Sequence, residues 1–194
     1  MSRLAIFVSG SGTNMENLIK EAQTGNIPGL SVELVVCDNP EAKAIEKAKC
    51  LGVELALVER KKFASKEIFE NEIIRPLEKK QIDWIALAGF MRILSPVFVR
   101  QYKGRIVNIH PSLLPAFPGT HAILDAFEAG LSETGVTVHF VDEGVDTGPI
   151  ILQRKVSIAP GETLETLEAK IHQVEYQLYP EALRKAISSR IRFS

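Results

Sequence analysis

The first half of the chain alternates short apolar, β-branched runs with longer charged segments of helical period, and this alternation restricts the possible folds more than any other feature. Strands separated by helices are typical of parallel sheets, because a parallel connection needs a long crossover. The expected strands cover 4–8, 31–37, 53–58, 83–88 and 106–109, and the expected helices cover 14–24, 40–51, 66–81 and 96–102. Right-handed crossovers would wind these elements into a mostly parallel, twisted, Rossmann-like α/β sheet flanked by helices.

The pattern changes after Pro111. A proline-rich stretch and a short helix over 123–130 precede two extended runs, 135–141 and 150–158, which we interpret as an antiparallel addition to the sheet. A final helix is expected over 163–187, since Thr163-Leu164-Glu165-Thr166 is a capping sequence close behind Pro160-Gly161. The length of 194 residues and the 45% hydrophobic content fit one domain over 1–194.

Charge and composition exclude several classes of protein. The net charge is −1 and the sequence pI about 6.4, so nothing points to nucleic acid or an anionic membrane surface as a partner. The N-terminal apolar run is too short for a signal peptide, and no stretch is long enough to span a bilayer, which favours the cytoplasm. Cys37 and Cys50 lack CxxC spacing and are expected to be reduced, buried thiols.

A glycine-rich turn follows the first expected strand. The run Ser9-Gly10-Ser11-Gly12-Thr13-Asn14 leaves a strand and enters a helix, where backbone amides and the helix dipole favour an anion. Met15 replaces the third glycine of the dinucleotide fingerprint, and the Gly-Lys-Ser/Thr ending of a P-loop is absent. The turn is therefore either a phosphate site or a tight turn with a capped helix, and Asp38 keeps a nicotinamide enzyme open as an alternative.

Asn108 and His110 stand two residues apart on an expected strand, so both side chains project from the same face. Pro111 holds His110 extended and ends the strand. The pair is thereby expected at the carboxyl edge of a parallel sheet, where open α/β folds bind ligands.

Three segments together resemble the folate-dependent formyltransferases. The octapeptide NIHPSLLP at 108–115 resembles the signature of that family, and AGFMRILS at 88–95 and DEGVDTGPI at 142–150 resemble its folate-binding segments in the same order. With the glycine-rich turn, the resemblance covers nearly every expected element. It implies formyl transfer from 10-formyltetrahydrofolate, a co-substrate, to the amine of 5-phosphoribosylglycinamide (GAR), giving formyl-GAR and tetrahydrofolate in purine biosynthesis.

The resemblance also implies roles for individual residues. Asn108, His110 and Asp146 match the catalytic residues, although 142–148 alone would be interpreted as a solvated acidic turn. The residues matched to the GAR and phosphate site are Gly12, Thr13, Asn14 and Glu175. The residues matched to the folate site are Lys66, Met91, Arg92, Ile93, Leu94, Asn108, Asp142, Glu143, Gly144 and Val145, with Lys66 on either the phosphate or the folate side. We therefore expect the domain to consist of two halves: a phosphate-binding half over about 1–100, and a folate-binding and catalytic half over about 101–194.

One segment departs from the family pattern. Thr120-His121-Ala122-Ile123 stands where relatives often have another histidine or a differently placed polar residue, and His121 is expected at a helix start facing solvent or the rim of the site. The four histidines lack ligand spacings and the implied chemistry needs no Lewis acid, so no metal is expected.

Several alternatives stay open. They are another user of formyl-tetrahydrofolate, such as a sugar-nucleotide formyltransferase, a formyl-folate hydrolase, a nicotinamide-dependent oxidoreductase, and a non-catalytic folate-binding protein. A monomer and a homodimer are both compatible with the sequence.

Overall fold

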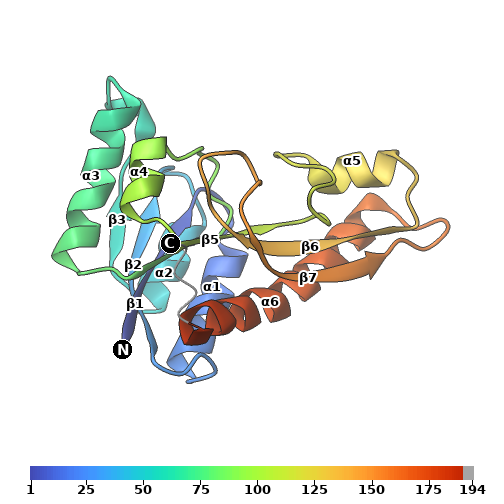
Figure 1. Ribbon diagram of the computed structural model, residues 1–194, viewed down its shortest axis with the longest axis horizontal. Helices are drawn as coiled ribbons and strands as arrows, with labels where there is room; N and C mark the ends of the chain where they lie inside the picture. The colour runs from blue at the N-terminus through green and yellow to red at the C-terminus, as the bar shows by residue number, and fades with distance from the viewer. Residues whose placement is uncertain (190–194) are drawn as a thin grey trace.

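One mixed sheet organises the computed structural model, which describes residues 1–189 (Figure 1). Its strands lie in the order β3-β2-β1-β4-β5-β6-β7, with parallel pairing from β3 through β5 and antiparallel pairing of β6 and β7. The strands are β1 (Ser2–Val8), β2 (Leu30–Cys37), β3 (Leu55–Leu57), β4 (Trp84–Leu87), β5 (Ile106–His110), β6 (Glu133–Phe140) and β7 (Ile150–Ser157). The expected parallel sheet with an antiparallel addition is confirmed.

Helices cover both faces of the sheet. They are α1 (Thr13–Gln23), α2 (Ala44–Cys50), α3 (Lys66–Lys79), α4 (Pro96–Gln101), α5 (Ala122–Glu128) and α6 (Leu164–Ser189), with a short 3-10 helix, η1 (Arg60–Lys62). The alternation of β1 divides the core: Leu4, Ile6 and Val8 pack with α1, α2 and α6, whereas Ala5 and Phe7 pack with α3 and α4. The near-continuous apolar run of β1 is thus explained by burial on both faces.

Two elements, one helix and one strand, are only about half as long as expected. The helix expected over 40–51 begins at Ala44, because Asn39 accepts a hydrogen bond from the Glu41 N–H and donates to the Ser9 carbonyl, which fixes a turn before the helix. The strand expected over 53–58 is reduced to β3, because the Val53 N–H is used at the end of α2, where it donates to the Ala48 carbonyl.

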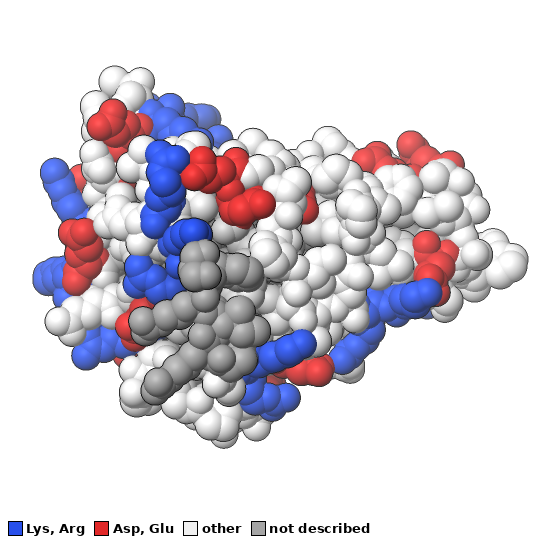
Figure 2. Space-filling view, viewed as in Figure 1, with Lys and Arg blue, Asp and Glu red and all other residues white. Residues whose placement is uncertain are grey.

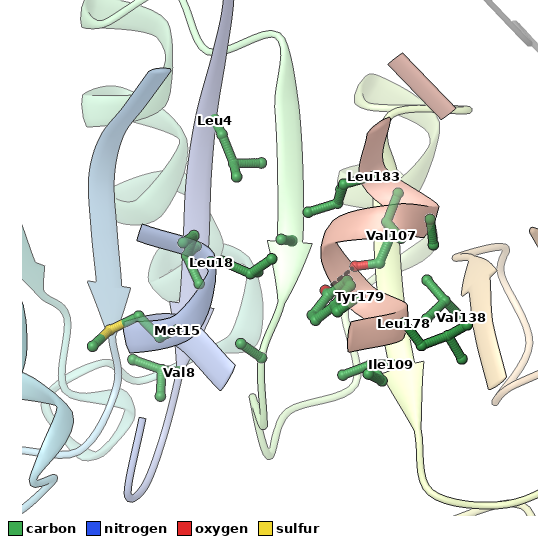
Figure 3. Close-up of a cluster of buried hydrophobic side chains, with 14 of the residues drawn as sticks. Leu4, Val8, Met15, Leu18, Val107, Ile109, Val138, Leu178, Tyr179 and Leu183 are labelled. Carbon is green, nitrogen blue, oxygen red and sulfur yellow. Dashed lines mark hydrogen bonds between the residues drawn. The ribbon is translucent and has the colours of Figure 1, made fainter. Parts of the chain in front are cut away.

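The last helix is anchored to the centre of the sheet. Thr163 accepts the Thr166 N–H as the capping sequence predicts. Further along α6, Tyr179 is fully buried among the side chains of Figure 3, and its hydroxyl lies 2.8 Å from the Leu87 carbonyl and 3.0 Å from the Val107 carbonyl. Burial raises the pKa of Tyr179 well above its ordinary value, so the hydroxyl stays a donor. This contact fixes the turn of α6 that carries Glu175, four residues earlier.

Surface features fit the composition. Basic and acidic side chains are interspersed over the face shown in Figure 2. Among residues 1–189, no helix is both long and apolar enough to cross a membrane. Both cysteines are free, but only Cys37 is buried. The expectation of a buried Cys50 was wrong, because α2 turns Ala44 and Ala48 toward the core and thereby directs Cys50 away from it.

Candidate active site

A cavity of about 580 Å³ opens at the carboxyl ends of β1, β4 and β5. From β1 the chain winds to β2 and β3 on one side and returns to β4 on the other, so the cavity lies at the point where strand order reverses. The glycine-rich turn lines it together with the segments after β4 and β6. The cavity therefore lies at the carboxyl edge of the sheet, where the sequence places Asn108 and His110.

Asp146 joins the polar side chains at the centre of this cavity. Its Oδ2 accepts the Gly119 N–H at 2.9 Å and lies 3.5 Å from His110 Nδ1, while its Oδ1 lies 3.4 Å from Asn108 Nδ2. His110 is buried, and its Nε2 donates to the Phe117 carbonyl at 2.7 Å. The structure thus brings the sequence-matched residues Asn108, His110 and Asp146 into one cluster.

The environment of Asp146 favours its charged form. Burial would raise the pKa of Asp146, but contacts with His139, the Gly119 N–H and the charge of His110 outweigh burial and lower the pKa below its usual value. Asp146 and Phe117 also have positive φ angles of 55° and 52°, which side-chain-bearing residues rarely adopt. Strained backbone of this kind concentrates at functional sites, where surrounding contacts hold it in place.

His139 completes the cluster and was not among the residues predicted for it. It lies on β6 directly opposite Asn108, with Nε2 at 3.2 Å from Asn108 Nδ2 and 3.6 Å from Asp146 Oδ1. Its Nδ1 donates to the Phe140 carbonyl, which fixes the ring orientation. The pairing register that places it there is absent from the sequence; alternation along 135–141 shows only that His139 shares a face with Thr137.

The glycine-rich turn forms one end of the cavity. Gly12 precedes α1 with φ at 69°, and no side chain caps the helix, so its first N–H groups are available to an anion. Gly12 also packs tightly: a Cβ built there would lie 2.7 Å from Ala44 Cβ. Only glycine meets both requirements.

Glu175 stands beside this turn as a buried carboxylate, in contrast to the solvated position usual for a helical glutamate. It accepts from Asn14 Nδ2 at 2.9 Å, and His172 Nδ1 lies 2.8 Å from the same oxygen, Oε2. The Glu175 contact raises the pKa of His172 although burial opposes it. Asn14 Oδ1 is buried without a partner, which leaves an acceptor at this end of the cavity.

The segment after β4 forms another part of the cavity lining and is held at both of its ends. The Met91 N–H donates to Ser9 Oγ at 2.8 Å, and the Ser95 N–H donates to the buried Glu70 carboxylate at 2.7 Å. Met91 and Ile93 are exposed, so they offer apolar surface at the mouth of the cavity.

Most of the other sequence-matched residues also line the cavity. They are Gly12, Thr13, Asn14, Met91, Arg92, Ile93, Leu94, Asp142, Gly144, Val145 and Glu175. Three candidates lie outside its lining: Lys66 begins α3, Glu143 pairs with Arg100 at 3.0 Å, and the exposed His121 precedes α5. Within residues 1–189, no group of three or more His, Cys, Asp or Glu side chains is arranged to hold a metal ion.

Comparison with known proteins agrees with this architecture. The family model described as Formyl transferase matches residues 2–183. A phosphoribosylglycinamide formyltransferase of Bacillus subtilis (strain 168) is 43% identical over 187 residues, covering 96% of this chain and 95% of that protein. The trifunctional purine biosynthetic protein adenosine-3 of Drosophila melanogaster is 44% identical over 96% of this chain, which spans 14% of that protein. The crystal structure of glycinamide ribonucleotide transformylase 1 from Geobacillus kaustophilus is 57% identical with a TM-score of 0.92, covering 95% of this chain and 97% of that one. The chain belongs to the formyl transferase family.

Proposed function

We propose that this chain transfers the formyl group of 10-formyltetrahydrofolate to the amine of 5-phosphoribosylglycinamide, in purine biosynthesis. The observation that carries the proposal is the convergence of Asn108, His110 and Asp146 in one cavity that the start of α1 and the segment after β4 also line. The start of α1 offers helix N–H groups suited to a phosphate, and the segment after β4 offers apolar side chains and backbone groups suited to a folate.

In the first step the neutral amine attacks the formyl carbon, and the carbonyl electron pair moves to oxygen to form a tetrahedral oxyanion. The Asn108 amide supplies one N–H donor at the centre of the cavity, and His110 supplies a second once its Nε2–H turns from the Phe117 carbonyl to the oxyanion. The Asn108 contact to Asp146 at 3.4 Å is long, so this donor can turn to the oxyanion at small cost. Donors of this kind contribute about 3–4 kcal/mol each to transition-state stabilisation.

In the second step the intermediate collapses, the bond from carbon to the folate N10 breaks, and N10 takes up a proton. His110 transfers this proton from the attacking amine, directly or through a water. Asp146 orients the imidazole, because its carboxylate faces Nδ1 and is itself held by the Gly119 N–H.

The ends of the cavity position the two substrates. The N–H groups of Thr13 and Asn14 bind the phosphate, and Glu175 receives the glycinamide side. The segments 91–94 and 142–145 bind the pterin through backbone groups and apolar side chains. Holding both reactants in line is itself a large part of catalysis.

The proposal is tested by following loss of the formyl group from 10-formyl-5,8-dideazafolate by absorbance, with and without glycinamide ribonucleotide. We expect turnover only when the ribonucleotide is present. Equal turnover without it would indicate a hydrolase, and absence of turnover would reject the proposed reaction.

A titration with NADH tests the nicotinamide alternative. A ribose-binding acid must face the cavity, whereas the side chain of Asp38 is only 1% exposed and accepts from Arg92. We therefore expect no change in NADH fluorescence.

A further inference from the structure

Asp38, the acid after β2, is placed where the reaction makes no direct use of it. Its side chain is 1% exposed, and the residue does not line the cavity. One oxygen, Oδ2, accepts from Arg92 Nε at 2.6 Å, and the other, Oδ1, is buried without a partner. A buried carboxylate with an unsatisfied oxygen is costly, so its charge needs an explanation beyond stability.

Arg92 is the residue through which Asp38 can act. Its side chain is 44% exposed, and it lines the mouth of the cavity between the exposed Met91 and Ile93. A guanidinium carries five N–H donors in a rigid fork, and the Asp38 contact uses only the one on Nε. The four on the Nη atoms have no protein partner within residues 1–189, and the buried carboxylate sets the orientation of the side chain that carries them.

The backbone around Arg92 is held by contacts that do not involve Asp38. Ser9 and Glu70 already hold the backbone of the segment at Met91 and Ser95, on either side of Arg92. The remaining freedom is that of the long Arg92 side chain, whose rotamer entropy would otherwise be lost on binding. Asp38 removes that freedom before the ligand arrives.

We infer that Asp38 is a positioning residue for the folate end of the site: it holds the Arg92 guanidinium ready to donate to the folate co-substrate. The inference rests on the proposed function, because it takes the ligand at this mouth to be the folate. It also assigns Asp38 a role different from ribose recognition.

The test is a steady-state double-mutant cycle with Asp38→Asn and Arg92→Gln. Asp38→Asn is expected to raise the KM for 10-formyl-5,8-dideazafolate about five- to twentyfold, while kcat and the KM for the ribonucleotide change less than about twofold. In the Arg92→Gln background the same substitution is expected to change the folate KM less than about twofold, since the two residues act as a unit. Arg75→Gln, which breaks an exposed ion pair with Glu72, is the matched control and should leave all three constants unchanged.

The outcomes separate this inference from the proposed reaction. An inactive wild-type protein rejects the reaction itself. An active wild type in which Asp38→Asn leaves the folate KM unchanged, raises both KM values equally, or acts independently of Arg92 overturns the positioning role. If Asp38→Asn fails to fold, Arg92→Gln and Arg92→Lys provide the measurement, because Arg92 is partly exposed. In these variants only the folate KM should rise. An equal rise in both KM values counts against the inference.

Discussion

Substitution of Gly12 by alanine tests the glycine-rich turn quantitatively. The left-handed φ of 69° costs a residue with a side chain about 1–2 kcal/mol. The new Cβ would also lie 2.7 Å from Ala44 Cβ and 2.9 Å from Ala44 Cα, and overpacking of this kind costs about 1–3 kcal/mol. We therefore expect Gly12→Ala to lower the free energy of unfolding by about 2–5 kcal/mol, measured by urea denaturation.

Two glycines provide matched controls. Gly25 has a φ of 79° but open space around its Cβ position, so Gly25→Ala should show only the conformational cost of about 1–2 kcal/mol. Gly10 has neither a positive φ nor a neighbour within 4 Å, and Gly10→Ala should change stability by less than about 0.5 kcal/mol. The change in unfolded-chain entropy is common to all three substitutions and cancels in the comparison.

A second-site substitution identifies the clash. In an Ala44→Gly background the cost of Gly12→Ala should fall by about 1 kcal/mol or more, because the closest atom is gone. The KM for the ribonucleotide should also rise in Gly12→Ala, since the start of α1 moves. The reasoning is refuted if Gly12→Ala is no more destabilising than Gly25→Ala, or if Ala44→Gly gives no relief.

Three further predictions concern groups around the site. Tyr179→Phe removes the hydroxyl that donates to the Leu87 and Val107 carbonyls and should cost about 0.5–1.5 kcal/mol in urea denaturation; an unchanged midpoint would contradict the anchoring of α6. The Glu175 contact raises the pKa of His172, so its stabilisation is complete below pH 6.5 and is lost as pH rises through the raised value. His172→Gln should then lose less stability than wild type between pH 6 and pH 9, and equal losses would reject the pairing. The pKa of Asp146 is lowered, so its stabilisation is present above pH 3.8 and is lost as pH falls through the lowered value; Asp146→Asn should show a shallower acid decline, and an identical decline would count against this.

Much of the fold could be predicted from the sequence, because burial on two faces leaves a strong record in residues such as Leu4–Val8. Parallel strands buried on both sides must be apolar throughout, and the crossover helices show their own period. The start of α2 could not be predicted, since it depends on the Asn39 side chain contacting the Ser9 carbonyl, a contact between distant residues. The end of α2 likewise shortens β3 through one hydrogen bond of Val53.

The candidate site was predictable where residues stand close in the chain. Asn108 and His110 share a face because a strand alternates, and Pro111 places them at its end. His139 was missed because its place depends on the register between β5 and β6. Asp38 kept a nicotinamide enzyme open as an alternative, because its spacing from the turn says nothing of Arg92, which comes from a later segment.

The central claim is that Asn108, His110 and Asp146 act together in formyl transfer, and a kinetic cycle tests it most directly. The formyl-loss assay is run on His110→Ala, Asp146→Asn and the double variant, with both KM values measured. Residues that act as a unit are strongly non-additive, so each single variant should lose about a hundredfold or more in kcat and the double variant hardly more. If the kcat losses of the two single variants multiply in the double variant, the joint role is contradicted. If His110→Ala keeps a kcat close to that of the wild type, the site itself is contradicted.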